Sequence, residues 1–310
     1  MTHGAHEHPS DARNDNVLVD LNGELVPKAE ATVSVLDSGF ILGDGIWEGL
    51  RLHEGRIAFL DRHLRRLFDA ARAIDLDLGL TPDELTARLA RVLSANGMWD
   101  HVHLRLMVSR GVKSTPYQDP RATVTPPTIV ILPEYKEPTD ALYGKGLSLF
   151  TVHVRRGRPD VQDPRLNTHS KHNCIQACIQ AAKAGADEGL MLDPQGFVAT
   201  CNSTHFFIVR GGEVWTSTGN YCLDGITRGT VIDVARDAGI PVFERNFSLS
   251  DVYGADEVFV TGTFAGLVSV GSVDGRSFPG PYPGPMVERL QGLYRERIAA
   301  EPPLPGLERG

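Results

Sequence analysis

The stretch Leu223-Asp-Gly-Ile-Thr-Arg228 decides how the second half of this chain is interpreted. A helical pattern follows it as far as Ala238, so Gly225 stands directly before the first turn of a helix. The free amide groups and the positive dipole end of a helix start suit an anion, and Gly225 lets the backbone come close to one. The hydroxyl of Thr227 adds a donor. The stretch predicts a phosphate site without a lysine, although an ordinary glycine turn with a threonine cap has the same residue types.

A second candidate anion site follows the strand pattern Glu257-Val-Phe-Val260. It is the stretch Thr261-Gly-Thr-Phe-Ala-Gly266, whose backbone amides and two hydroxyls come directly at a strand end. The signal of this turn alone is weak. It gains weight because the turn and the Gly-Ile-Thr stretch fall in the same half of the chain.

The third candidate is the glycine-rich segment that runs from Asp37 to Arg51. Its glycines predict close backbone packing near a site. Arg51 stands among apolar neighbours on a predicted strand, where a guanidinium requires an anionic partner. A phosphate would be a bidentate partner for it.

Lysine is rare in this chain and occurs only at positions 28, 113, 136, 145, 171 and 183. Lys171 precedes an alanine-rich helical pattern, and an amine beside a phosphate site suggests a Schiff base with a phosphorylated aldehyde cofactor. Lys183 lies near the predicted C-terminus of that helix, where a solvated lysine complements the helix dipole. We therefore favour Lys171 as the reactive amine over Lys183.

The composition limits the class of protein. The chain has 310 residues, enough for two domains, and a net charge of −8 without a basic block, which argues against nucleic acid and anionic membranes as partners. No apolar run is long enough to cross a bilayer. The N-terminus lacks the apolar core of a signal peptide, and four cysteines without zinc-ligand spacing fit a reducing cytoplasm. His3, His6 and His8 suggest a disordered tail rather than a metal site, so we expect no metal.

Periodicity predicts a mixed α+β organisation. We expect a disordered tail at 1–16, a small domain at 17–132, a linker at 133–146 and a larger domain at 147–310. Predicted strands lie at 17–21, 24–26, 31–36, 50–53, 56–59, 101–109, 128–132, 147–154, 189–192, 206–209, 213–216, 241–244 and 257–261. Predicted helices lie at 60–74, 82–96, 173–184, 226–238 and 285–299.

Five motifs together carry a resemblance: residues 43–51, 185–193, 223–228, 255–263 and 284–286. In this order they resemble the class IV, or fold type IV, pyridoxal-phosphate (PLP) aminotransferases, most of all branched-chain aminotransferase-like proteins. The resemblance covers about residues 17 to 298. It implies a small N-terminal α/β domain, a larger C-terminal pseudo-barrel domain, PLP in the cleft between them and a homodimer. It also implies an amino-acid or amine donor and an α-keto acid acceptor.

The resemblance also assigns roles by position. It implies PLP contacts at Arg51, Thr200, Leu223, Gly225, Ile226, Thr227, Gly262 and Thr263. Arg105 occupies the position of a substrate-side arginine of branched-chain enzymes, although a surface arginine on a strand fits equally well. Trp47 and Phe264 suggest a partly apolar substrate pocket, and both could equally belong to the core. The Arg-x-His carboxylate trap of the D-amino-acid enzymes is absent after Gly111, which disfavours that branch.

Two positions depart from the family pattern. The register of the family lysine falls on Asn167, and Lys171 stands four residues later. Thr200 takes the place of the glutamate that pairs with the pyridine nitrogen, and a hydroxyl supplies no charge to strengthen the electron sink. The leading hypothesis is an aminotransferase with Lys171 as the Schiff-base lysine. Thr200 keeps a PLP-dependent lyase or racemase open, and Asn167 keeps a non-catalytic PLP-binding homologue open.

Overall fold

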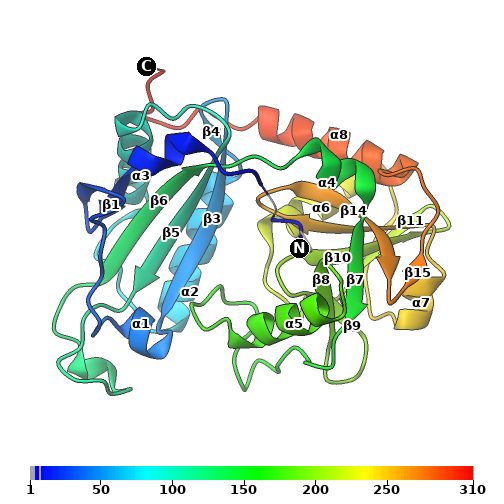
Figure 1. The fold of residues 1–310 in the computed structure, drawn as a ribbon, viewed down its shortest axis with the longest axis horizontal. Helices are drawn as coiled ribbons and strands as arrows, with labels where there is room; N and C mark the ends of the chain where they lie inside the picture. Colours follow the sequence, from blue (N-terminus) through cyan, green and yellow to red (C-terminus); the bar gives the residue numbers. More distant parts are fainter. Residues whose placement is uncertain (1–3, 7, 310) are drawn as a thin grey trace. The chain divides into compact units, whose positions relative to one another are not determined.

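The computed structural model describes residues 4–6 and 8–309, which form two compact units (Figure 1). The small unit comprises residues 9–137, 167–170 and 300–309. The large unit comprises residues 138–166 and 171–299 together with the described residues before Pro9. The chain passes from the small to the large unit between Glu137 and Pro138, inside the stretch expected as a linker.

The small unit is built on a six-stranded antiparallel sheet in the order β2-β1-β6-β5-β3-β4. Its strands are β1 (Leu18–Leu21), β2 (Glu24–Pro27), β3 (Gly45–His53), β4 (Arg56–Ile57), β5 (Val102–Ser109) and β6 (Thr128–Tyr135). Its helices are α1 (Ser38–Leu42), α2 (Leu60–Ala73) and α3 (Pro82–Ala95), with short 3₁₀ turns η1 (Ala12–Asn16) and η2 (Pro120–Ala122). The predicted hairpins around Asn22-Gly23 and Glu54-Gly55 are confirmed.

Local sequence signals explain these elements. Asn22 and Gly23 have φ angles of 55° and 91°, as a two-residue hairpin turn requires. Thr81 and Glu84 form a complete capping box at the start of α3, with proline in its first turn. Helix α2 packs on β3, and α3 packs on β1 and β6, so one face of the sheet is buried. The opposite face carries Trp47, Arg51 and Arg105.

The large unit contains a nine-stranded mixed sheet in the order β12-β11-β10-β13-β14-β7-β8-β9, with β15 paired to β14. The strands are β7 (Leu147–Thr151), β8 (Glu188–Leu192), β9 (Val198–Cys201), β10 (His205–Arg210), β11 (Glu213–Thr216), β12 (Val242–Glu244), β13 (Glu257–Gly262), β14 (Gly266–Val273) and β15 (Arg276–Ser277). The sheet curls, because the end strand β9 returns to β10, where the Cys201 amide donates to the Thr204 carbonyl at 2.9 Å. This curled sheet confirms the predicted pseudo-barrel of a fold type IV protein.

In the described part of the large unit there are five helices: α4 (Asp140–Lys145), α5 (His172–Lys183), α6 (Ile226–Asp237), α7 (Leu249–Tyr253) and α8 (Pro285–Ala299). Helix α5 packs on β7 and β8, whereas α6 and α8 pack on each other and on β13 (Figure 1). The inner face of the sheet holds a large apolar core that includes Leu190, Phe206, Val260 and Val268. This core fixes the ends of β9, β10 and β13, where the candidate site residues lie.

Several short elements differ from the prediction. Residues 31–36 form no strand, and Val33 and Val35 are 49% and 73% exposed, because no neighbouring strand pairs with this alternating segment. Strands β9, β14 and β15 and helices α1, α4 and α7 were not predicted. Helix α1 has five residues and depends on a cap from the Asp37 side chain, so it is too short for a helical period to be visible.

The N-terminal segment also differs from the expectation of a disordered tail. Ala5 is only 3% exposed, and residues 4–6 belong to the large unit. Because Gly4 has no side chain, the backbone there packs closely against the start of β8. Of the three histidines weighed as a metal site, His3 lies outside the described residues, and within the described ranges no group of three or more histidine, cysteine or acidic side chains could hold a metal ion. None of the described helices is long and apolar enough to cross a membrane.

Candidate active site

The start of helix α6 has the geometry that its sequence predicts. Gly225 is the N-cap residue, and no described side chain caps the helix. A Cβ atom on Gly225 would stand 2.1 Å from Nε2 of His205, so only glycine fits here without displacing the imidazole. The φ angle of Gly225 is −71°, which any residue can adopt, so the close approach rather than the backbone conformation requires glycine. The amides of this first turn are therefore available to an anion.

Thr227 in the first turn of α6 is tied to helix α8. Both Thr227 and Tyr294 are buried, at 3% and 6% exposure. Burial raises the pKa of Tyr294 to about 12, and a hydrogen bond from the Thr227 side chain acts in the opposite direction. The phenol therefore stays neutral and keeps the Thr227 hydroxyl in a fixed orientation.

The second predicted anion stretch forms the turn between β13 and β14, where Gly262 pairs with Gly266. Thr261, the last threonine before this turn, is fully buried, and among the described residues its hydroxyl has no hydrogen-bond partner. Thr263 lies in the turn and is partly exposed, whereas Phe264 is 4% exposed. A buried hydroxyl without a partner costs free energy, so this threonine suits a ligand that supplies an acceptor.

Two side chains join the start of α6 to this turn. His205 contacts Gly225 and stands directly opposite Thr261 in the pairing of β10 with β13. Tyr294 bonds to Thr227, and a Cβ on Gly266 would lie 3.3 Å from its ring. The two predicted anion stretches are thus neighbours within the large unit. Together, their amides and the hydroxyls of the second stretch form a donor set that fits the phosphate of PLP, whereas the Thr227 hydroxyl, expected as a further donor, gives its proton to Tyr294.

Sequence reasoning did not single out His205 or Tyr294. His205 begins an otherwise apolar strand pattern, His-Phe-Phe-Ile-Val, and this polar residue at a strand start was the available signal. Tyr294 lies inside the pattern of an amphipathic helix and gave no signal, because only tertiary packing brings it to Thr227. Leu223 is half-buried, and its carbonyl accepts a hydrogen bond from the Gly225 amide at 2.8 Å.

Thr200 lies on β9 and is buried. Its hydroxyl donates to the carbonyl of Thr204 at 2.8 Å. Because its one proton is used, Thr200 can offer only lone pairs to a further partner. It can therefore accept a hydrogen bond from a protonated pyridine nitrogen, but it brings no negative charge to it.

The segment around Lys171 is divided between the two units. Asn167 is buried in the small unit, where its carbonyl accepts from the Trp47 amide at 2.9 Å and its side chain donates to the Trp47 carbonyl at 2.7 Å. His169 continues this pairing through its amide, which donates to the Gly45 carbonyl at 2.9 Å. Lys171 belongs to the large unit, is half-buried and stands at the N-cap of α5. Asn167 at the family lysine register thus has a structural explanation.

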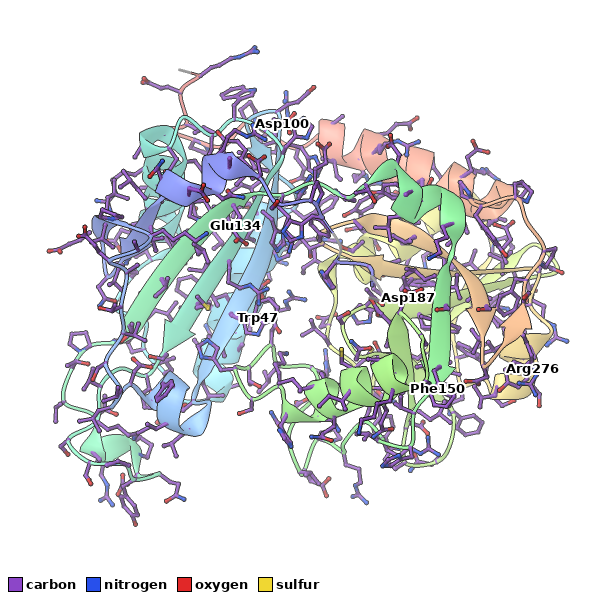
Figure 2. All side chains as sticks on the ribbon, in the orientation of Figure 1. Trp47, Asp100, Glu134, Phe150, Asp187 and Arg276 are labelled. Atoms are coloured by element: carbon purple, nitrogen blue, oxygen red, sulfur yellow. The ribbon has the colours of Figure 1, made fainter. Side chains whose placement is uncertain are left out.

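In the small unit, Arg51 and Arg105 lie on the sheet face that carries Trp47. Arg51 on β3 is 3% exposed and donates to the Lys136 carbonyl. Arg105 on β5 stacks over the Trp47 ring, with the guanidinium carbon 4.1 Å from the ring centroid. Burial lowers the pKa of Arg105, and the charge of Glu134 on β6 acts in the opposite direction. Figure 2 labels Trp47 and Glu134 on this sheet.

The match to a family model decides the classification. The model of amino-transferase class IV matches residues 45–273. This chain belongs to the class IV aminotransferases. It is 38% identical over 283 residues to branched-chain-amino-acid aminotransferase-like protein 2 of Arabidopsis thaliana, covering 91% of this chain and 50% of that protein. It is 37% identical over 278 residues to the putative branched-chain-amino-acid aminotransferase of Methanocaldococcus jannaschii, covering 89% of this chain and 94% of that protein.

A solved structure supports the same fold. The branched-chain amino acid aminotransferase of Thermobaculum terrenum, solved in its PLP form, matches with a TM-score of 0.82 and 26% identity. The match covers 92% of this chain and 94% of that one. Class IV aminotransferases depend on PLP, which confirms the predicted cofactor. The chain spans about half the length of the two Arabidopsis relatives that it matches.

Proposed function

We propose that this chain is a PLP-dependent aminotransferase that moves an amino group from an amino acid or amine to an α-keto acid. The observation that carries the proposal is the start of α6. Helix α6 begins there directly after Gly225, and no described side chain caps it. Only glycine fits at position 225, and the turn after β13 lies beside the helix start. The class IV aminotransferases, to which this chain belongs, use PLP, and this donor set suits the phosphate of PLP.

In this proposal the large unit holds the phosphate through the amides of Ile226 and Thr227 and through Gly262 and Thr263. Leu223 packs against the pyridine ring, and Arg51 of the small unit supplies the guanidinium for the phosphate. Gly225 keeps the approach to the helix start open. These groups bind and orient, because amides and hydroxyls at a helix start favour an anion without transferring protons.

When bound, PLP supplies a carbonyl carbon that reacts with amines and an electron sink for the substrate α-carbon. Lys171 would supply the amine that holds the cofactor, and the freed amine would serve as base and acid for the proton at the substrate α-carbon. Lys171 is half-buried and stands at the N-cap of α5, four residues after Asn167. A neutral amine is the form that attacks a carbonyl and accepts a proton.

We propose that the substrate side is formed by Arg105, Trp47 and Phe264. Stacking on Trp47 holds the Arg105 guanidinium, which suits a carboxylate of the donor or acceptor. Trp47 supplies apolar surface, whereas Phe264 is 4% exposed and belongs to the apolar core of the large unit, so it lies behind the turn after β13. We further propose that the enzyme is a cytoplasmic homodimer. Helix α5 supports a dimer through its solvent-facing Ile175 and Ile179, which are 52% and 41% exposed.

The test is covalent trapping of the cofactor. Borohydride treatment of the holoenzyme, followed by peptide mapping, is expected to place the reduced cofactor on Lys171. The matched variants are Lys171→Ala, which is expected to lose the adduct and amino transfer, and Lys183→Ala, which is expected to keep both. A Lys171→Ala protein that still binds the cofactor covalently would overturn the assignment of the amine. A holoenzyme that transfers no amino group would overturn the function.

Thr200 motivates a second candidate, a PLP-dependent lyase. A neutral hydroxyl whose proton is already used stabilises a protonated pyridine less than a carboxylate does. A weaker electron sink keeps the lyase open beside the aminotransferase. Release of ammonia from an amino acid, without the pyridoxamine form of the cofactor, would favour the lyase. Exchange of amino groups between an amino acid and a keto acid would favour the aminotransferase.

A further inference from the structure

The N-terminal segment lies against the large unit beside the turn that follows β13. A Cβ on Gly4 would stand 3.0 Å from the carbonyl oxygen of Asp187, so the backbone is packed closely on the start of β8. Asp187 is labelled in Figure 2. Ala5 is 3% exposed. This degree of burial indicates that the segment has a defined position on the large unit and is not a loose tail.

Glu188 lies against Gly4 and Ala5 of this segment. Its carboxylate is 2% exposed and accepts a hydrogen bond from the Thr204 hydroxyl at 2.7 Å. Burial raises the pKa of Glu188 to about 7, while the hydroxyls of Thr204 and Ser203 and the Ala5 amide act in the opposite direction. Among the described residues Oε1 has no partner within hydrogen-bond geometry, so the Ala5 amide acts as a nearby dipole. A backbone dipole directed at a buried carboxylate helps to hold the segment.

His6 follows Ala5 and lies over Phe264. The two rings stack with their centroids 6.0 Å apart and their planes 21° apart. His8 approaches the same ring edge-on at 6.1 Å. Phe264 is 4% exposed, whereas His6 is exposed. The imidazole of His6 therefore forms an outer layer over a residue that we place on the substrate side.

A narrow cavity of about 10 Å³ remains at this contact. Its lining includes Ala5, His6, Thr204, Gly262, Phe264 and Val268. Most of this lining is hydrocarbon, and the Thr204 hydroxyl already donates to Glu188. The space therefore offers apolar contact and few polar partners, and Ala5 and His6 of the N-terminal segment form part of its lining. Removal of the imidazole would enlarge it for an alkyl group rather than for a charged one.

We propose that His6 is a specificity-determining residue of the substrate site. Together with Ala5 it forms a wall, carried on the N-terminal segment, that limits the size of the apolar group placed against Phe264. The inference rests on the proposed function, because that function places Phe264 beside the substrate. The wall follows from contacts within the large unit alone: the Gly4 packing on β8, the burial of Ala5 and the stacking of His6.

The first test compares substrates of different length. In His6→Ala the ring is removed and the cavity opens, so kcat/KM for a straight-chain six-carbon 2-oxo acid, relative to the four-carbon acid, is expected to rise about tenfold. His6→Phe keeps a ring for stacking on Phe264 and is expected to keep the wild-type ratio. Ser10→Ala changes an exposed residue outside the contact and serves as the matched control. An unchanged ratio in His6→Ala would overturn the proposal.

The second test does not depend on turnover. Calorimetric titration of the holoenzyme with butanoate and hexanoate measures the same size limit through unreactive carboxylates. His6→Ala is expected to bind hexanoate about tenfold more tightly and butanoate unchanged. If His6→Ala changed the affinities for both acids equally, or changed neither, the proposal that His6 limits ligand size would be overturned. Failure of the wild type to transfer any amino group would overturn the proposed function instead, and the titration would still decide whether His6 limits ligand size.

Discussion

The hydroxyl of Thr200 donates a hydrogen bond to the carbonyl oxygen of Thr204 at 2.8 Å, in the bend between β9 and β10. This bond determines which further hydrogen bonds the Thr200 hydroxyl can make. Its proton points to the backbone, so its lone pairs are left for a partner that brings its own proton. At the position where the family pattern has a glutamate, the chain thus keeps an acceptor but not a charge.

Replacement of Thr200 tests this acceptor. Thr200→Val keeps the shape of the side chain and removes the oxygen, so the proposed acceptor for the pyridine nitrogen is lost and kcat is expected to fall about tenfold. Thr200→Ser keeps the oxygen and is expected to stay within about threefold of the wild type. Steady-state kinetics with one donor and acceptor pair would measure both. If the valine variant matched the serine variant, Thr200 would have no role at the ring nitrogen.

Tyr294→Phe tests whether the phenol of α8 holds the turn that we propose binds the phosphate. The variant leaves the Thr227 hydroxyl without its Tyr294 partner, so PLP affinity is expected to fall about fivefold, which corresponds to about 1 kcal/mol. Affinity for pyridoxal, which lacks the phosphate, is expected to stay unchanged. Equilibrium titration of the apoprotein with each cofactor would measure this difference. Tyr253→Phe, which removes a hydrogen bond to Asp274 on another part of the unit, is the control.

An equal loss of affinity for PLP and pyridoxal in Tyr294→Phe would count against a role at the phosphate. It would instead indicate a general effect of the lost hydroxyl on the packing of α8.

Gly225→Ala tests the close approach at the start of α6. The new methyl group would occupy the place of the His205 imidazole, so the free energy of unfolding is expected to fall by about 2 kcal/mol and PLP binding to weaken. Urea denaturation and cofactor titration would measure both effects. At the control position, Gly157, an added Cβ meets no described atom within 4 Å, and Gly157→Ala is expected to change stability by less than about 0.5 kcal/mol.

The double variant Gly225→Ala, His205→Ala identifies the cause. If the imidazole is the obstacle, its removal is expected to restore part of the stability that Gly225→Ala loses. Strict additivity of the two losses would show that another contact makes glycine necessary at this position.

Glu188 predicts a pH dependence of stability. Burial raises its pKa from the usual 4.5 to about 7, so the folded protein binds a proton more tightly at this site than the unfolded chain does. The stabilisation by the protonated carboxyl is fully present below about pH 4.5 and is lost as the pH rises through about 7. Glu188→Gln removes this dependence, so its unfolding free energy relative to wild type is expected to rise by up to about 3 kcal/mol from about pH 5 to about pH 8.

Urea denaturation at the two pH values would measure this change. Glu24→Gln, at an exposed position of β2, is the control and is expected to show the same pH dependence as the wild type. A Glu188→Gln variant whose stability parallels the wild type across this range would show that Glu188 is ionised in the folded protein, as in the unfolded chain.

Much of the fold could be predicted because its signals are local. The capping box at Thr81, the Asn22-Gly23 turn and the helical periods of α2 and α8 depend on residues within a few positions of one another. The glycine-rich motifs likewise identified the family, which the match over residues 45–273 confirms. By contrast, residues 31–36 alternate like a strand but do not form one, because no neighbouring strand pairs with them. The periodicity of a single segment cannot show whether a neighbouring strand is present.

The candidate site shows the same division. The sequence by itself determined the family, the cofactor and the helix start at Gly225, because glycine and hydroxyl residues at fixed spacing carry that chemistry locally. Only the tertiary structure decided that His205 and Tyr294 join the two anion-binding stretches, and that Ala5 and His6 pack on Glu188 and Phe264. These contacts join residues from 20 to about 260 positions apart, and no local pattern encodes them because they arise from the packing of whole elements.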